Sequence, residues 1–275
     1  MSESRVQTAS DAQRWAVALA RVSSLDSHLR VDPMAHPEWT RADALADPPM
    51  LAGLLETAAR HRGTTERRVA ASLFLAEYAW RVAAPAVASY LTTGDVPVLT
   101  PESVFVDFDG AAEPVAVAFA AGAFVASGQP PGHLAGSGRA DPQCVPLRGA
   151  LRSELEGHLE GLIAGVRAIT GTGLHTLWAM SADAVAGAFL WAGRCAEMEQ
   201  QAAREAQALL APGDTRLTGG VRFVTIDAGG GPRVSRLRGT CCLSYRLAGT
   251  QYCAGCPLIP EAERLTRLQA ALAID

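Results

Sequence analysis

The sequence contains no lysine, so all 24 of its basic residues are arginine. With so much alanine beside them, this bias indicates a GC-rich genome more than a chemical requirement. The 28 acidic residues outnumber the arginines and leave a net charge of −4. Because phosphate binding relies on a concentrated positive surface, this balance argues against nucleic acid as a main partner.

Long apolar runs are also missing. The N-terminal residues MSESRVQTAS lack the apolar stretch of a secretory signal. The most apolar run, residues 115–126, is too short to cross a bilayer. We therefore expect a cytoplasmic protein without a transmembrane segment. Disulfides are uncommon in that compartment, so a group of cysteines is interpreted first as a metal site.

The sequence shows no phosphate-binding loop. Such a loop follows a strand and opens a helix, which neither residues 171–173 nor residues 229–231 are expected to do. We therefore expect no flavin or nicotinamide site, so electrons would come from a separate protein such as a ferredoxin or its reductase. No nucleophile is paired with a base, and the six histidines show no metal-ligand spacing.

The apolar spacing predicts a mainly helical chain of the α+β class, long enough for one large domain or two small ones. Asp47 precedes two prolines, which is typical of a helix start, and this helix is expected to stop at Gly63. Thr64 or Thr65 is expected to cap a longer helix that Pro85 kinks. Further helices are predicted over 11–29, 147–169 and 181–210. The second of these carries Gly157, Gly161 and Gly165, a stripe that admits close packing of another backbone or a bulky ligand.

Two β-hairpins are expected between the helices. The runs 103–108 and 114–120 flank Asp109-Gly110, and the runs 221–227 and 232–238 flank three glycines. The Gly- and Pro-rich stretch 128–146 is expected to be a loop and a candidate lid or ligand wall. A last helix is expected to open at Pro260. We predict a helical domain with a central hairpin over residues 1–215 and a C-terminal strand and loop segment over residues 216–275.

Four of the six cysteines lie within sixteen residues: Cys241, Cys242, Cys253 and Cys256. Their pattern is C-C-x10-C-x2-C, and four soft sulfur ligands suit either zinc or an iron–sulfur cluster. Structural zinc sites usually use two separated C-x2-C pairs. The adjacent cysteines and the Cys256-Pro257 step therefore favour iron–sulfur without excluding zinc. A vicinal disulfide between Cys241 and Cys242 is disfavoured in a reducing compartment.

Residues 236–258 resemble the C-terminal signature of the bacterial ferric-siderophore reductase family, of the ferrioxamine B reductase type. The shared elements are Arg238-Gly239-Thr240, the adjacent cysteines, Tyr245-Arg246-Leu247 and the final C-x2-C pair. Two weaker stretches, 73–91 and 177–181, also resemble the family. The resemblance implies that all four cysteines bind one [2Fe–2S] cluster.

The resemblance also implies an activity. The chain would be an oxidoreductase of iron acquisition that transfers one electron from the cluster to Fe(III) in a siderophore and releases Fe(II). The family's typical substrates and the acidic charge favour a hydroxamate chelate, bound between the cluster segment and the helical domain. The rival interpretation is a non-enzymatic iron–sulfur redox sensor or a zinc-stabilised binding module.

Several side chains are candidates for supporting roles. Cys195 is interpreted as a small apolar residue of a helix, and Cys144 lies in the proline-bracketed loop. Four arginines near the cysteines would stabilise the reduced cluster or dock an acidic donor, although solvated strand faces would explain each one as well: Arg233, Arg236, Arg238 and Arg246. The candidates for substrate contact are His133, Trp178, Trp191 and Tyr245.

Overall fold

A computed structural model describes residues 9–26, 29–32, 36–120, 122–131, 142–213, 215–227 and 231–272. The α-helices are α1 (Ala9–Leu25), α2 (Pro48–His61), α3 (Arg67–Thr93), α4 (Val145–Thr170), α5 (Leu174–Cys195), α6 (Glu199–Leu209) and α7 (Glu261–Leu272). The strands are β1 (Arg30–Asp32), β2 (Thr40–Arg41), β3 (Asp95–Pro97), β4 (Val104–Phe108), β5 (Pro114–Phe119), β6 (Phe124–Ser127), β7 (Arg222–Asp227) and β8 (Pro232–Leu237). Short 3-10 turns are η1 (Ala42–Ala46), η2 (Pro142–Cys144) and η3 (Ser244–Arg246). This confirms the predicted α+β, mainly helical class.

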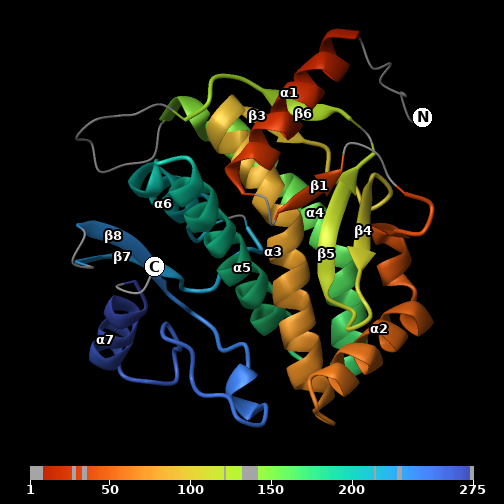
Figure 1. Cartoon of the computed structure of the whole chain (residues 1–275), viewed down its shortest axis with the longest axis vertical. Helices are drawn as coiled ribbons and strands as arrows, with labels where there is room; N and C mark the ends of the chain where they lie inside the picture. The colour runs from red at the N-terminus through yellow and green to blue at the C-terminus, as the bar shows by residue number, and fades with distance from the viewer. Residues whose placement is uncertain are drawn as a thin grey trace.

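Helix α3 lies at the centre of the molecule, between α5 on one side and the strands β4 and β5 on the other (Figure 1). Both central helices bury many alanines, such as Ala83 on α3 and Ala186 on α5, each 0% exposed. Small side chains let two helix backbones approach closely, so α3 and α5 make the most extensive helix pair of the fold. Pro85 lies inside α3, which continues through it from Arg67 to Thr93.

The helix boundaries follow the predictions in part. Asp47 caps α2 as predicted, because its side chain accepts a hydrogen bond from Met50 N at 3.1 Å. The predicted cap of α3 is wrong: Glu66 occupies that position, and Thr64 instead accepts a hydrogen bond from Glu66 N in the turn before the helix.

The helix predicted over 181–210 is two helices. Helix α5 already begins at Leu174, and the chain turns at Glu197, which has a φ of 55°. Helix α6 then folds back onto α5. A Cβ at Gly193 would lie 2.5 Å from that of Ala202, so the glycine permits this close packing.

The first predicted hairpin is confirmed. Strands β4 and β5 pair antiparallel, with Val106 opposite Val117. Asp109 closes the connection, because its Oδ1 accepts hydrogen bonds from Ala111 N and Glu113 N at 2.8 and 2.9 Å. The hairpin belongs to a larger sheet of order β1-β5-β4-β2, in which β1 runs parallel to β5.

The predicted loop over 128–146 lies partly outside the described residues, which omit 132–141. Its last residues are helical rather than a loop: η2 ends at Cys144 and α4 begins at Val145. Pro146 sits in the first turn of α4. A proline is tolerated there because the amide it lacks would have no partner within the helix.

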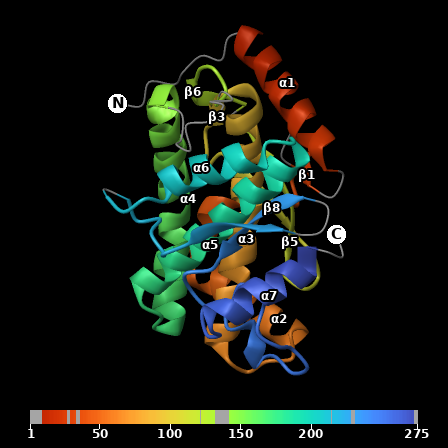
Figure 2. The ribbon, with the colours of Figure 1, turned by 90° about the vertical axis from the view of Figure 1, so that its left-hand side faces the viewer.

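The C-terminal segment is a hairpin followed by the cysteine loop and α7. Strands β7 and β8 pair antiparallel as predicted, with Val224 opposite Ser235. A small core of Ile226, Leu237, Leu268 and Leu272 joins α7 to the hairpin. The hairpin crosses α5 and α6 (Figure 2), where Val234 packs with Leu190 and Ala203. The division at residues 215/216 stays a prediction. None of the described helices is both long and apolar enough to cross a bilayer.

Candidate metal centre and the adjoining groove

The two cysteine pairs are brought together by the end of β8. Arg238 N donates to Gly255 O at 3.2 Å, so the chain entering the first pair lies beside the turn of the second pair. That turn is closed by Cys256 N donating to Cys253 O at 3.0 Å. Gly255 permits this approach, because a Cβ there would lie 2.9 Å from Arg236 O.

The four thiols contact one another in two pairs. Cys242 hydrogen bonds with Cys253, and Cys241 hydrogen bonds with Cys256. The adjacent cysteines therefore reach different partners. Leu243 follows them with a φ of 65°, a left-handed conformation that turns the chain and directs its N–H to Cys241 Sγ at 3.4 Å.

The thiols differ in acidity. The hydrogen bond from Cys253 lowers the pKa of Cys242 to about 4, and Arg238 also lowers it. The same hydrogen bond raises the pKa of Cys253. Burial raises the pKa of Cys241 to about 11. Because only thiolates bind metals, loading this site must release protons.

The thiol arrangement suits a cluster of two metals. Two thiol pairs fit a [2Fe–2S] cluster, in which each iron takes two protein ligands. Cys242 and Cys256 are buried, whereas Cys241 and Cys253 are partly exposed.

Two arginines of the β8 end are buried between the cysteine loop and α5. Arg236 lies against Gly187, where a Cβ would approach its guanidinium to 1.8 Å, and burial lowers its pKa to about 10. Arg238 forms an ion pair with the buried carboxylate of Asp183 at 3.4 Å. The sequence pattern did not single out Asp183, because its partners lie 53 to 57 residues away along the chain.

The other two candidate arginines lie apart from this pair. Arg233 forms an ion pair with Glu199 at 3.3 Å, and Arg246 forms one with Glu66 at 2.8 Å. The four candidate arginines therefore form two groups in the structure. Arg236 and Arg238 contact the carboxylate or carbonyl of Asp183. Donor docking stays a prediction for the other two.

A groove lies between α3, α5 and the end of β8. It consists of two hollows of about 300 and 370 Å³ that share Trp80, Arg236 and Arg238 as lining residues. We call it the Trp80 groove. Cys253 and Trp191 line the second hollow, so a half-exposed cysteine opens onto the groove. Small-ligand sites begin at volumes of this order.

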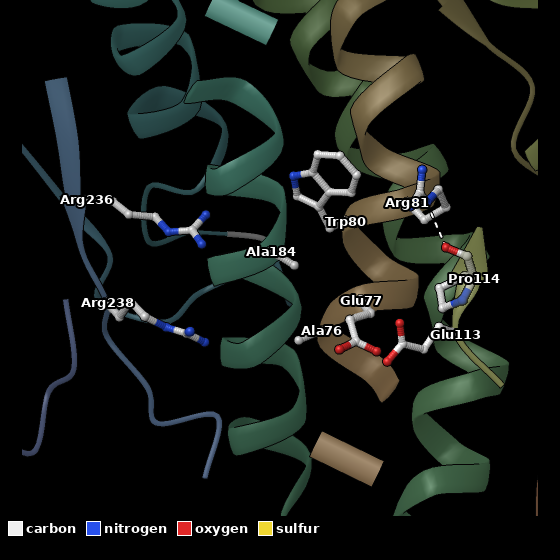
Figure 3. Close-up of a pocket in the computed structure, with 9 residues that line it drawn as sticks. All are labelled: Ala76, Glu77, Trp80, Arg81, Glu113, Pro114, Ala184, Arg236 and Arg238. Atoms are coloured by element: carbon white, nitrogen blue, oxygen red, sulfur yellow. Dashed lines mark hydrogen bonds between the residues drawn. The ribbon is translucent and has the colours of Figure 1, made fainter. Parts of the chain in front are cut away.

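The first hollow has charged side chains on both sides (Figure 3). Arg236 and Arg238 extend from the end of β8 on one side, and Glu77, Glu113 and Arg81 lie on the opposite side. Both glutamates pair with the guanidinium of Arg62, so this second wall holds charges of both signs. Burial raises the pKa of Glu77, while Arg62 opposes this effect.

The predicted substrate contacts lie in different places. Trp191 lines the Trp80 groove and packs edge-to-face with Trp80, with ring centroids 5.7 Å apart. Trp178 lines another pocket, with Arg216 above its ring. Tyr245 packs against Tyr252 beside the cysteines. His133 lies outside the described residues.

Trp80 was not a candidate on sequence grounds, although it lies in a stretch that resembles the family. Its position on an apolar helical stripe is typical of a core residue. The partly exposed ring instead lies between α3 and α5 at the groove (Figure 3).

Residues 238–258 match the family model of the FhuF 2Fe-2S C-terminal domain, and this range contains all four clustered cysteines. No curated protein matches the chain. The match is specific for the cysteine loop, and it names an iron–sulfur cluster where the spacing alone left zinc open.

Proposed function

Because its residues 238–258 are a [2Fe–2S] domain of the FhuF type, we propose that the chain is a ferric-siderophore reductase. When bound, the cluster supplies one electron, which reduces Fe(III) in the chelate to Fe(II) and leaves the chelating ligand unchanged. Siderophores bind Fe(II) far more weakly than Fe(III), so this single electron makes the metal labile. The step needs no nucleophile and no general base.

The observation that carries this proposal is the opening of Cys253 onto the Trp80 groove. Electron transfer weakens steeply with distance, so the oxidant must come close to a cluster ligand. A ferric chelate is too large for a closed core, but part of it can enter an open groove. Trp80 and Trp191 offer apolar surface to such a ligand beside the cysteine.

A net charge of −4 on the protein supports a neutral or cationic chelate of the hydroxamate type. In the groove, Asp183 pairs with Arg238, and Glu77 and Glu113 share the guanidinium of Arg62. A ferric catecholate carries several negative charges, so we expect the acidic protein to repel it except where Arg236 and Arg238 face it. The electron donor is proposed to be a separate protein such as a ferredoxin or its reductase.

The test is stopped-flow oxidation of the prereduced cluster by ferric hydroxamates and ferric catecholates of similar potential. We expect faster oxidation by the hydroxamates. Equal or faster oxidation by the catecholates would refute the charge argument. If neither chelate oxidises the cluster, the reductase proposal fails and a redox sensor takes its place.

A variant that fills part of the Trp80 groove tests whether the substrate binds there. Ala76 lines the first hollow, and Ala76→Leu is expected to slow chelate-dependent oxidation about tenfold or more by filling that space. Oxidation by a small outer-sphere oxidant such as ferricyanide should be unchanged. Ala168→Leu, on the exposed face of α4, is the matched control and should leave both rates unchanged. Equal rates in the two leucine variants would place the chelate elsewhere.

A further inference from the structure

Asp183 is a charged residue buried in the wall of the cysteine loop. It lies in α5 and is 0% exposed. Its Oδ2 accepts a hydrogen bond from Thr240 N at 3.3 Å and pairs with Arg238 Nε at 3.4 Å. Its backbone carbonyl accepts a further hydrogen bond from Arg236 Nη1 at 2.7 Å. One residue of α5 thus holds both buried arginines and the residue directly before Cys241.

One oxygen of the Asp183 carboxylate lacks a hydrogen bond. Oδ1 is buried and has no hydrogen-bond partner within the described part of the chain. The carboxylate interacts with the charges of both Arg238 and Arg236, so a neutral side chain here would leave two arginine charges without their counter-charge. Arg238, its ion-pair partner, also interacts electrostatically with Cys242 and Cys253. The carboxylate therefore acts on the same charge network as the thiolates.

We propose that Asp183 is a positioning residue that holds the Arg236–Arg238 pair and the Thr240 backbone in place and lowers the reduction potential of the cluster. Reduction adds one negative charge to a group already surrounded by four thiolates. A nearby buried carboxylate disfavours that charge, because the surroundings screen it weakly. This inference depends on the [2Fe–2S] cluster alone, and it holds whichever oxidant the protein serves.

The test is a redox titration of the purified holoprotein, followed by absorption and EPR, without any siderophore. Asp183→Asn keeps the shape and an acceptor oxygen for Thr240 N but removes the charge. At a fixed solution potential we expect the ratio of reduced to oxidised cluster to rise about tenfold, which corresponds to about 59 mV for a one-electron couple. An unchanged or lowered ratio would overturn the proposal.

A matched control separates charge from structural damage. Glu205 is also 0% exposed and paired with an arginine, Arg148, but it lies in α6 and contacts Tyr90 of α3. Glu205→Gln is expected to lower the melting temperature without moving the cluster potential. An equal shift in both variants would mean that loosened packing, not the Asp183 charge, alters the cluster.

Two further variants keep the proposal testable if Asp183→Asn does not bind a cluster. Asp183→Glu keeps the charge and should retain a potential close to that of the wild type. Asp183→Ser removes the charge with a smaller side chain, and it should shift the potential in the same direction as Asp183→Asn. Loss of the cluster from both neutral variants would also overturn the proposal, because Asp183 would then be a requirement for assembly.

Discussion

Each of the adjacent cysteines meets a thiol from the second cysteine pair. Cys241 contacts Cys256 and Cys242 contacts Cys253, so each contact joins the two halves of the loop. A sequence pattern can count four ligands, but it does not pair them. The pairing results from the left-handed turn at Leu243 and the hydrogen bond from Arg238 N to Gly255 O.

The ligand assignment is tested one residue at a time. Serine at Cys241, Cys242, Cys253 or Cys256 is expected to abolish the visible absorption of the cluster and to lower bound iron and sulfide together. Cys144→Ser and Cys195→Ser are the controls and should retain the full spectrum. A protein that holds zinc in place of iron and sulfide, or that loses its cluster in either control, would contradict the assignment.

His158 shows how a buried histidine can serve structure alone. Its Nδ1 lies 2.7 Å from Leu99 O, a carbonyl that can only accept, so Nδ1 carries the proton. Nε2 therefore accepts the hydrogen bond from the Tyr78 hydroxyl at 2.8 Å. Burial lowers the pKa of His158 to about 4, against the hydrogen bond to Leu99 and the charge of Glu102.

This histidine predicts a pH dependence of stability. Between pH 6.5, the ordinary pKa of histidine, and about pH 4, His158 is protonated in the unfolded chain but stays neutral in the folded protein. The free energy of unfolding should therefore fall as the pH drops through this window, by about 3 kcal/mol from this group. Denaturant unfolding at several pH values, compared with His158→Gln, isolates the effect because carboxylates contribute equally to both proteins. His175→Gln, at an exposed position, is the control and should keep the wild-type slope. An equal slope in His158→Gln would contradict the prediction.

At the scale of elements, the glycine stripe of α4 serves helix packing. A Cβ at Gly165 would lie 2.7 Å from Leu51 Cδ2, and one at Gly161 would lie 3.7 Å from Ala46 Cβ. Gly157 has no atom within 4 Å at that point. The stripe therefore faces η1 and α2 at two positions and solvent at the third, and close helix packing is the alternative that the structure supports.

The same substitution should act in opposite ways along this stripe. Gly165→Leu is expected to lower the free energy of unfolding by about 1–3 kcal/mol, because Leu51 is fully buried and leaves no room. Gly157→Leu should raise it by up to about 1 kcal/mol through helix propensity. Urea unfolding of both variants measures the difference. A change of equal size and sign at both positions would contradict the assigned packing of Gly165 against Leu51.

Both predicted hairpins formed because their signals are local. Asp109 specifies a turn within a few residues of β4 and β5, and alternating apolar residues specify the strands of both hairpins. The break between α5 and α6 has no such signal. It depends on Glu197 in a left-handed conformation and on the close approach of Gly193 to Ala202, which join residues of different helices.

At the scale of the whole molecule, we expect the electron donor to be a separate protein that reaches the cluster from outside. Residues 171–173 connect α4 to α5 with no preceding strand, so they do not form a phosphate-binding loop. We expect NADPH alone to leave the oxidised cluster unchanged, and a ferredoxin with its reductase to bleach it. Anaerobic absorption spectra measure both. Bleaching by NADPH alone, or stoichiometric flavin in the purified protein, would contradict this expectation.

The sequence alone indicated a group of four sulfur ligands and most of the helices and strands around it. Four cysteines in one short loop, two turn signals and the helical stripes are properties of neighbouring residues. Only the tertiary structure decided which distant residues lie beside the cysteine loop. It joins Asp183 to Thr240 across 57 positions, and it places Trp80 beside Trp191 and Cys253 at one groove. Such contacts arise because α3, α5 and β8 bury their apolar faces against one another, and no local pattern records which distant residue lies opposite.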